Sequence, residues 1–129
     1  MTNRHQPHVL VLPEDDANRQ IANGFLMGLD QPTLKQIQVL PPAGGWKAVL
    51  HEFESNHVVG MDRYSGRYMV LLIDFDGQAG RLNVVKQKIP QHLQERVFFL
   101  GWGHNLLRHN EVEIERLRRH VRPILFRAT

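Results

Sequence analysis

Three carboxylates follow two of the most apolar segments of the chain, at spacings that suit the binding of a divalent cation. Glu14 comes just after the apolar segment 8–12. Asp74 and Asp76 come directly after the apolar segment 68–73. Residues i and i+2 of an extended segment point to the same side, so the two aspartates can face one pocket. Carboxylates gathered in one pocket repel one another, and a cation such as Mg²⁺ or Mn²⁺, bound by carboxylates and waters, offsets that repulsion.

A purely structural role is also open for these acids. Acidic residues at the ends of strands often cap the helix that follows, and this is the expected role of Asp15 and Asp16. Asp76 followed by Gly77 is typical of a turn. The metal site and the structural roles are therefore two interpretations of the same spacing.

The segments that must position these acids alternate between strand and helix patterns. Segments 8–12 and 68–73 are apolar on both faces, as in buried parallel strands. Segment 35–40 alternates polar and apolar residues, which is typical of a half-exposed edge strand, and segment 96–100 is the fourth predicted strand. Helical spacing of apolar residues predicts the helices, which span approximately 16–29, 46–55, 80–89 and 111–121.

Local signals set the limits of these helices. A loop is expected over 56–66, which is rich in Gly, His and Asp, and Pro123 is expected to end the last helix. The first helix is expected to bury an apolar stripe, formed by Ile21, Phe25, Leu26 and Leu29.

Four strands joined by helices predict an α/β fold, a three-layer sandwich around a four-stranded, mainly parallel sheet. The half-exposed strand fits an edge, and the two apolar strands fit the centre, which gives the strand order 2-1-3-4. We expect one domain over 1–129, with a core at about 8–105 and a basic C-terminal helix and tail over 106–129. Ligands of such sheets bind beyond the carboxyl ends of the strands, where the order reverses. That point lies between the first and third strands, which brings the three acids together.

A Glu at the end of the first strand and an Asp-x-Asp at the end of the third resemble the Toprim domain, over about residues 8–105. That fold occurs in topoisomerases, bacterial primases, recombination mediators and overcoming-lysogenization-type nucleases. The resemblance implies that Glu14 is a general acid or base and a metal contact, and that Asp74 and Asp76 bind Mg²⁺. Toprim domains commonly have Gly after the Glu, where this chain has Asp15, and a side chain there restricts how closely a phosphate can approach.

The segment 11–19 also resembles the acidic opening of a response-regulator receiver domain, a fold of similar length. In this interpretation Asp74 is the phosphoacceptor. The chain departs from receivers in the long separation between Asp15 and Asp74, and no fifth strand ending in Lys-Pro is recognisable. No Ser or Thr comes directly after the fourth strand.

Two further groups of residues are candidates for contact with phosphates. His104 lies in the loop after the fourth strand, at the same edge as the acids, where it could position a phosphate or relay a proton as a second catalytic residue. In the basic C-terminal segment, Arg119, Arg122 and Arg127 are candidates for contact with nucleic acid or an acidic partner. The alternative is a solvated helix face, with the three glutamates of segment 111–115 balancing the arginines.

The composition excludes several functional classes. With 42% hydrophobic and 22% charged residues, the chain is too apolar to be disordered. The absence of Cys excludes disulfides, thiolate zinc sites and a cysteine nucleophile. No apolar run approaches the roughly 20 residues that span a membrane, and no secretory signal is recognisable, so a cytoplasmic protein is expected. The net charge of +3 permits contact with nucleic acid without arguing for it.

The sequence thus predicts a Toprim-like, Mg²⁺-binding domain in nucleic-acid phosphodiester chemistry, acting as a nuclease if it is active. Because the chain has room for little beyond such a core, we expect a homodimer or a partner protein. Two other interpretations stay open. One is a non-catalytic interaction or scaffold subunit that keeps the fold, and the other is an atypical receiver domain phosphorylated on Asp74.

Overall fold

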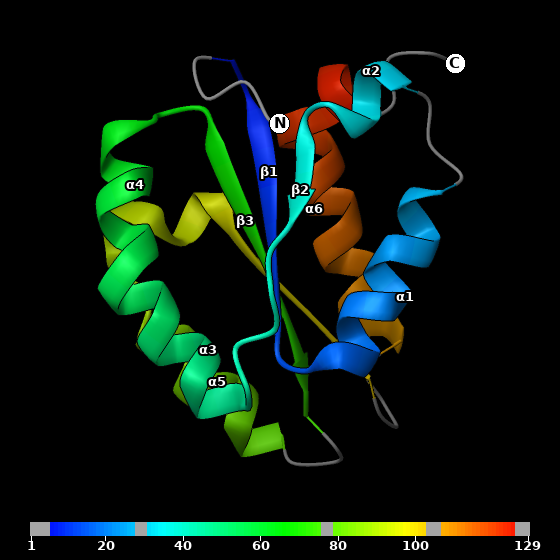
Figure 1. The fold of residues 1–129 in the computed structure, drawn as a ribbon. Coiled ribbons are helices and arrows are strands. Elements are labelled where there is room, and N and C mark those ends of the chain that lie inside the picture. Colours follow the sequence, from blue (N-terminus) through cyan, green and yellow to red (C-terminus); the bar gives the residue numbers. More distant parts are fainter. Residues whose placement is uncertain (1–5, 28–30, 76–78, 103–106, 126–129) are drawn as a thin grey trace.

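A parallel sheet forms the centre of the protein. The computed structural model describes residues 6–27, 31–75, 79–102 and 107–125. In these ranges the sheet has four strands, which are β1 (His8–Pro13), β2 (Ile37–Val39), β3 (Arg67–Asp74) and β4 (Val97–Trp102). They lie in the order β2-β1-β3-β4, and all three pairings are parallel (Figure 1). The predicted α/β fold and strand order are confirmed.

β1 and β3 occupy the centre of the sheet because both of their faces are apolar. Every residue of β1 is buried, and so are residues 69–73 of β3. The two strands pair in register from His8 opposite Arg67 to Pro13 opposite Leu72. The residue that follows β1 therefore leaves the sheet beside the last residue of β3.

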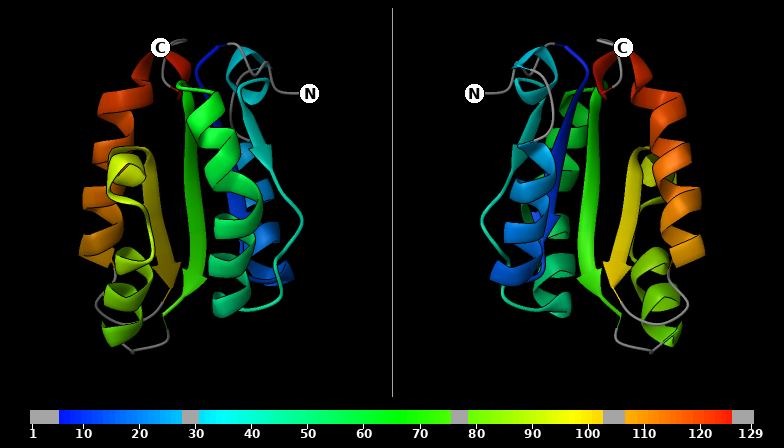
Figure 2. Two further views of the ribbon diagram at one scale, coloured as in Figure 1. Left: turned by 90° about the vertical axis from the view of Figure 1, so that its left-hand side faces the viewer. Right: turned by 90° about the vertical axis from the view of Figure 1, so that its right-hand side faces the viewer.

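Helices cover both faces of the sheet (Figure 2). On one face lie α1 (Asp16–Leu26) and α6 (Leu107–Leu125), with the short α2 (Gln31–Leu34) near one end. On the other face lie α3 (Trp46–Glu52), α4 (Val58–Arg63) and α5 (Ala79–Gln87). A π-helical turn, η1 (Phe53–His57), joins α3 to α4, and a 3₁₀ helix, η2 (Gln91–Arg96), precedes β4.

Alternate residues of the strands supply the two halves of the core. Leu12 and Leu71 point to the face of α3–α5, where they pack with Phe53 and Val85. On the opposite face the neighbouring strand residues pack with α1 and α6 in a second cluster of buried side chains: Val9, Val11, Val70, Leu72, Phe98 and Leu117. This two-faced burial holds the carboxyl ends of β1 and β3 in fixed positions.

The loop predicted over 56–66 is wrong, because the helix continues to Arg63. The backbone N–H of Val58 donates to the carbonyl of Phe53, five residues back, so η1 holds one residue more per turn than an α-helix. Phe53 and Met61 are both fully buried, so the helix keeps one face on the core across the π turn. The His57, Gly60 and Asp62 that suggested a loop lie within this helix.

Two further expectations about helices need correction. Ile21 is 48% exposed instead of buried, and α1 turns Asn18 and Ala22 toward the sheet. The other residues of the expected stripe lie outside the described side chains. Pro123 does not end the last helix, which begins at Leu107 and ends at Leu125, so the proline sits in the final turn and removes only one backbone hydrogen bond there.

No helix in the described ranges is long and apolar enough to cross a membrane.

Candidate metal centre

Glu14 and Asp74 come together at the carboxyl edge of the sheet. The backbone N–H of Glu14 donates to the carbonyl of Leu72 at 2.8 Å, which continues the pairing of β1 with β3 by one residue. The Glu14 side chain then reaches across to β3, where its Oε1 accepts a hydrogen bond from the backbone N–H of Asp74 at 3.3 Å. The carboxylate of one central strand therefore lies at the end of the other.

The segment that links β2 to α3 closes one side of this site. The backbone N–H groups of Gly44 and Gly45 donate to the carbonyl of Glu14 at 2.9 and 3.1 Å, and Ala43 donates to the carbonyl of Pro13 at 3.0 Å. Gly44 has φ +101° and Gly45 has φ +135°, a backbone region that other residues adopt only with strain. The two glycines let the loop turn sharply enough to donate both N–H groups to one carbonyl.

Arg81, in the first turn of α5, places a cation beside the acids. Its Nη1 donates to the carbonyl of Asp74 at 2.7 Å. Its guanidinium lies over the ring of Trp46, 4.9 Å from the ring centroid, which holds the side chain in a cation–π contact. A cation in the first turn of a helix faces the positive end of the helix dipole, so its position there needs compensation. That mismatch in the predicted helix 80–89 is the sequence signal by which Arg81 could have been found.

The surroundings of Glu14 disfavour its negative charge. Burial raises the pKa of Glu14 above its ordinary value of 4.5, and the N–H of Asp74 opposes that rise. The carboxylates of Asp15 and Asp74 raise the pKa further, whereas Arg81 lowers it. Glu14 thus holds a proton more readily than an exposed glutamate and gains from a cation that settles next to it.

Asp15 has the capping role that was expected of it, whereas Asp16 is the first residue of α1 and makes no capping hydrogen bond that the structure describes. Asp15 Oδ1 accepts a hydrogen bond from the backbone N–H of Asn18 at 2.8 Å, which caps the start of α1. Asp16 is exposed and accepts a hydrogen bond from the side chain of Gln20 at 2.7 Å.

The structure brings two of the three predicted metal ligands together. Asp76, His104 and Arg127 lie outside the described residues, and so does the side chain of Arg122 in α6. Arg119 is exposed on α6. Among the residues that the structure describes, no group of three or more His, Cys, Asp or Glu residues could hold a metal ion. The described part of the site is therefore a pair of carboxylate residues with one nearby arginine.

The solvated-face interpretation of α6 is wrong for Glu113 and Arg116. Glu113 is 7% exposed and pairs with Arg116, whose Nε lies 3.1 Å from Glu113 Oε1. The guanidinium of Arg116 also lies over the ring of Phe98 in β4, 4.3 Å from the centroid. These two charged residues dock α6 on the sheet instead of facing solvent.

The chain matches no family model, no curated protein and no solved structure. The arrangement at Glu14 and Asp74 must therefore be interpreted from its own chemistry. Two carboxylates at the ends of adjacent parallel strands can supply ligands to one divalent cation, whose remaining ligands are waters.

Proposed function

We propose that the protein binds Mg²⁺ or Mn²⁺ through Glu14 and Asp74 and uses the cation in phosphodiester chemistry on nucleic acid. The observation that carries the proposal is the hydrogen bond from the Asp74 N–H to Glu14 Oε1, because it joins the two strand ends at the predicted ligand position. The resemblance to Toprim domains, in which the same strand ends carry the metal ligands, supports the choice of reaction.

The charges around the site fit a divalent cation. The carboxylates of Asp15 and Asp74 act on Glu14, and Arg81 is the one cation among the groups that shift its pKa. The three carboxylates of Glu14, Asp15 and Asp74 and the guanidinium of Arg81 together carry a net charge of −2, which one Mg²⁺ neutralises. Mg²⁺ commonly takes one or two carboxylates and keeps several waters, so Glu14 and Asp74 are a sufficient protein contribution. Asp76 is a further candidate ligand.

Each described residue has a distinct task in this proposal. When bound, the cation supplies electrostatic stabilisation of the charge that develops on phosphate oxygens. Glu14 is a contact to the cation and the candidate general acid or base of the reaction. Arg81 fixes the end of β3 through the carbonyl of Asp74. His104 as a second catalytic residue, and Arg119, Arg122 and Arg127 as contacts to nucleic acid, belong to the same proposal.

A melting experiment tests the metal site. Thermal unfolding is measured with increasing Mg²⁺ for the wild type, for E14Q and D74N, and for the matched control E54Q, since Glu54 is exposed and distant in the sequence. A ligand at about 100 times its Kd stabilises by about 2.7 kcal/mol, so the melting temperature of the wild type and E54Q is expected to rise by several degrees. An equal rise in E14Q and D74N, or no rise in the wild type, contradicts the site.

Two activity assays separate the classes of function that share such a site. Metal-dependent cleavage of single- or double-stranded nucleic acid, lost in D74N, supports the nuclease. Metal binding without cleavage supports the non-catalytic scaffold. A labile aspartyl phosphate on Asp74 after incubation with a small phosphodonor supports the receiver and contradicts the proposed reaction.

A further inference from the structure

The outer edge of β4 is covered by polar side chains of α6. Glu113 Oε2 accepts a hydrogen bond from the N–H of Phe99 at 2.9 Å, and Arg116 donates to the carbonyl of Val97 at 2.8 Å. Strand edges offer unpaired N–H and C=O groups to other chains, and these contacts occupy them.

The same cover continues toward the end of the strand. Asn110 accepts from the N–H of Gly101 at 3.1 Å and donates to its carbonyl at 2.6 Å. His109 Nε2 lies 3.0 Å from the carbonyl oxygen of Phe99 and donates to it. The outward backbone groups of Phe99 and Gly101 are therefore all satisfied within the chain, so β4 is closed to a further strand.

The outer edge of β2 is treated differently. The N–H of Val9 donates to the carbonyl of Gln36, and the N–H of Leu40 donates to the carbonyl of Val11, each at 2.8 Å. Backbone groups alternate sides along a strand, so Ile37 and Val39 direct their N–H and C=O groups away from β1. Within the described ranges, no hydrogen bond reaches these four groups. Figure 1 looks at this edge, and no helix of the described chain crosses in front of it.

We propose that the open edge of β2 pairs with β2 of a second copy of the chain. The pairing is antiparallel, about a two-fold axis that passes between the two copies of Gln38. Ile37 of one copy then faces Val39 of the other, and each such pair exchanges two N–H···O bonds. The three residues are self-complementary, because all four outward groups find partners in an identical strand.

The side chains around this edge favour a second copy as the partner. Ile37 and Val39 are partly buried and pack on the core cluster of the α1 face, so the pairing places apolar side chains of both copies on the same face. Helix α1 contacts β2 and leaves Ile21 48% exposed. Within its three residues the strand has no proline or charged residue, although Lys35 and Pro41 flank it.

The paired segment is short, which sets the expected strength. Lys35 and Pro41 lie on either side of it, and proline cannot donate to a further hydrogen bond. Four hydrogen bonds with a small apolar patch make an interface below the usual size of a stable dimer, so the association is expected to depend on concentration. This dimer is independent of the metal site, since antiparallel pairing places the two Glu14–Asp74 sites at opposite ends of the joined sheet.

Sedimentation equilibrium tests the proposal on the full chain. The wild type is expected to shift from monomer to dimer between about 10 µM and about 1 mM. In Q38K two like charges meet at the axis, and its dissociation constant is expected to rise at least about tenfold. Gln38 is exposed, so this variant should fold, and circular dichroism checks that it does. The matched control Q87K, on the exposed surface of α5, should dimerise like the wild type.

Hydrogen exchange of two amides identifies the surface. The N–H groups of Ile37 and Val39 are expected to exchange more slowly as the dimer forms, whereas in Q38K they stay fast. A wild type that remains monomeric at about 1 mM overturns the proposal. So does a dimer that Q38K leaves intact, or a dimer in which these two amides exchange as fast as in the monomer.

Discussion

Replacing Glu113 by Ala should be among the most destabilising changes on the surface helices. The carboxylate is 7% exposed, accepts the N–H of Phe99 at 2.9 Å, and pairs with Arg116 at 3.1 Å. Ala leaves the buried N–H of Phe99 without an acceptor, which costs about 1–3 kcal/mol. It also leaves Arg116 without the carboxylate of Glu113. Removal of one member of a fully buried ion pair costs about 3–5 kcal/mol.

The expected total is smaller than the sum of these two costs. The Arg116 side chain is 33% exposed, so water compensates part of the lost ion pair. We therefore expect E113A to lose about 3 kcal/mol of unfolding free energy, a large fraction of the 5–15 kcal/mol typical of a domain. E113Q keeps an acceptor for Phe99 and loses only the charge, so its loss should be about 1 kcal/mol.

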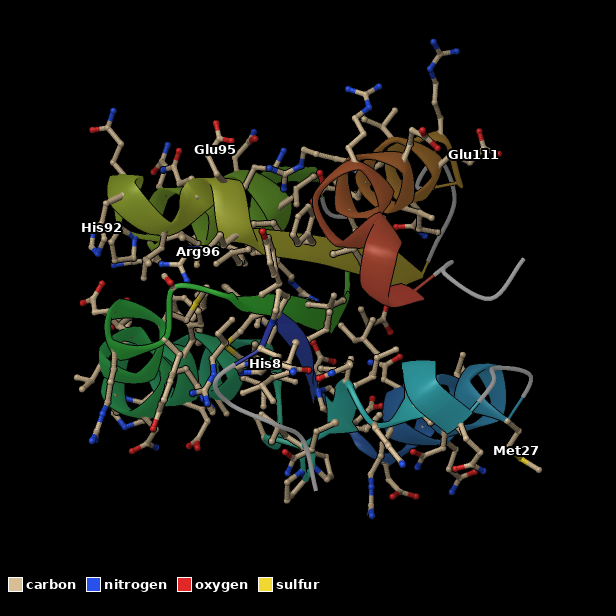
Figure 3. The ribbon with its side chains drawn as sticks, turned by 90° about the horizontal axis from the view of Figure 1, so that it is seen from above. His8, Met27, His92, Glu95, Arg96 and Glu111 are labelled. Atoms are coloured by element: carbon tan, nitrogen blue, oxygen red, sulfur yellow. The ribbon has the colours of Figure 1, made fainter. Side chains whose placement is uncertain are left out.

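Urea denaturation at neutral pH measures these differences as shifts of the midpoint at constant slope. The control is E111A, in the same helix, because Glu111 is exposed and stands on the outer side of α6 (Figure 3). The free energy of unfolding of E111A should differ from that of the wild type by no more than about 0.5 kcal/mol. The double variant E113A/R116M should lose less than the sum of the single variants, since the two side chains are in contact. A loss in E113A no larger than that in E111A refutes the docking role of Glu113.

Three further predictions concern Glu14 of the acidic site, the backbone of two glycines, and the partly buried His57. E14Q should stabilise the metal-free protein at pH 7 but not near pH 4. The raised pKa of Glu14 contributes stability that is present below the ordinary value of 4.5 and is lost as the pH rises, so at pH 7 the neutral Gln avoids the cost of the buried charge. Melting temperatures of both proteins, measured with a chelator at the two pH values, check this. G44A should lower the free energy of unfolding by about 1–2 kcal/mol, because φ is +101° at Gly44. G24A in α1 should raise it by about 0.5–1 kcal/mol, because an added Cβ meets no atom within 4 Å there. Equal shifts of the urea midpoint in the two variants contradict the backbone strain at Gly44. Burial lowers the pKa of His57, so the wild type should lose stability as the pH falls below 6.5, and H57Q, followed by melting from pH 7 to pH 5, should lose less.

The sheet and the meeting of Glu14 with Asp74 could be predicted because they follow from the strands alone. Apolar residues on both faces mark β1 and β3 as central, and a parallel pairing brings their carboxyl ends to the same edge. Once the strand order is known, the sequence therefore predicts that Glu14 lies next to Asp74.

The missed features depend on contacts between distant segments or on irregular helix geometry. α4 continues the preceding helix through the π turn at Phe53–His57, but its Gly60 and Asp62 are residue types typical of loops. Glu113 has the sequence context of a solvated residue, and its burial follows only from the docking of α6 on the edge of β4. The start of α5 was predicted to within one residue, but the contact of Arg81 with the carbonyl of Asp74 follows only from the packing of α5 beside the end of β3.

Paramagnetic broadening by Mn²⁺ tests the central claim, the binding of a divalent cation by Glu14 and Asp74, most directly. In two-dimensional NMR spectra with substoichiometric Mn²⁺, the backbone amide signals of Glu14, Gly45 and Asp74 should broaden first, and Mg²⁺ should restore them. The same titration of D74N should leave these signals sharp. Broadening that begins at exposed acids such as Glu54, or that is unchanged in D74N, contradicts the proposed site.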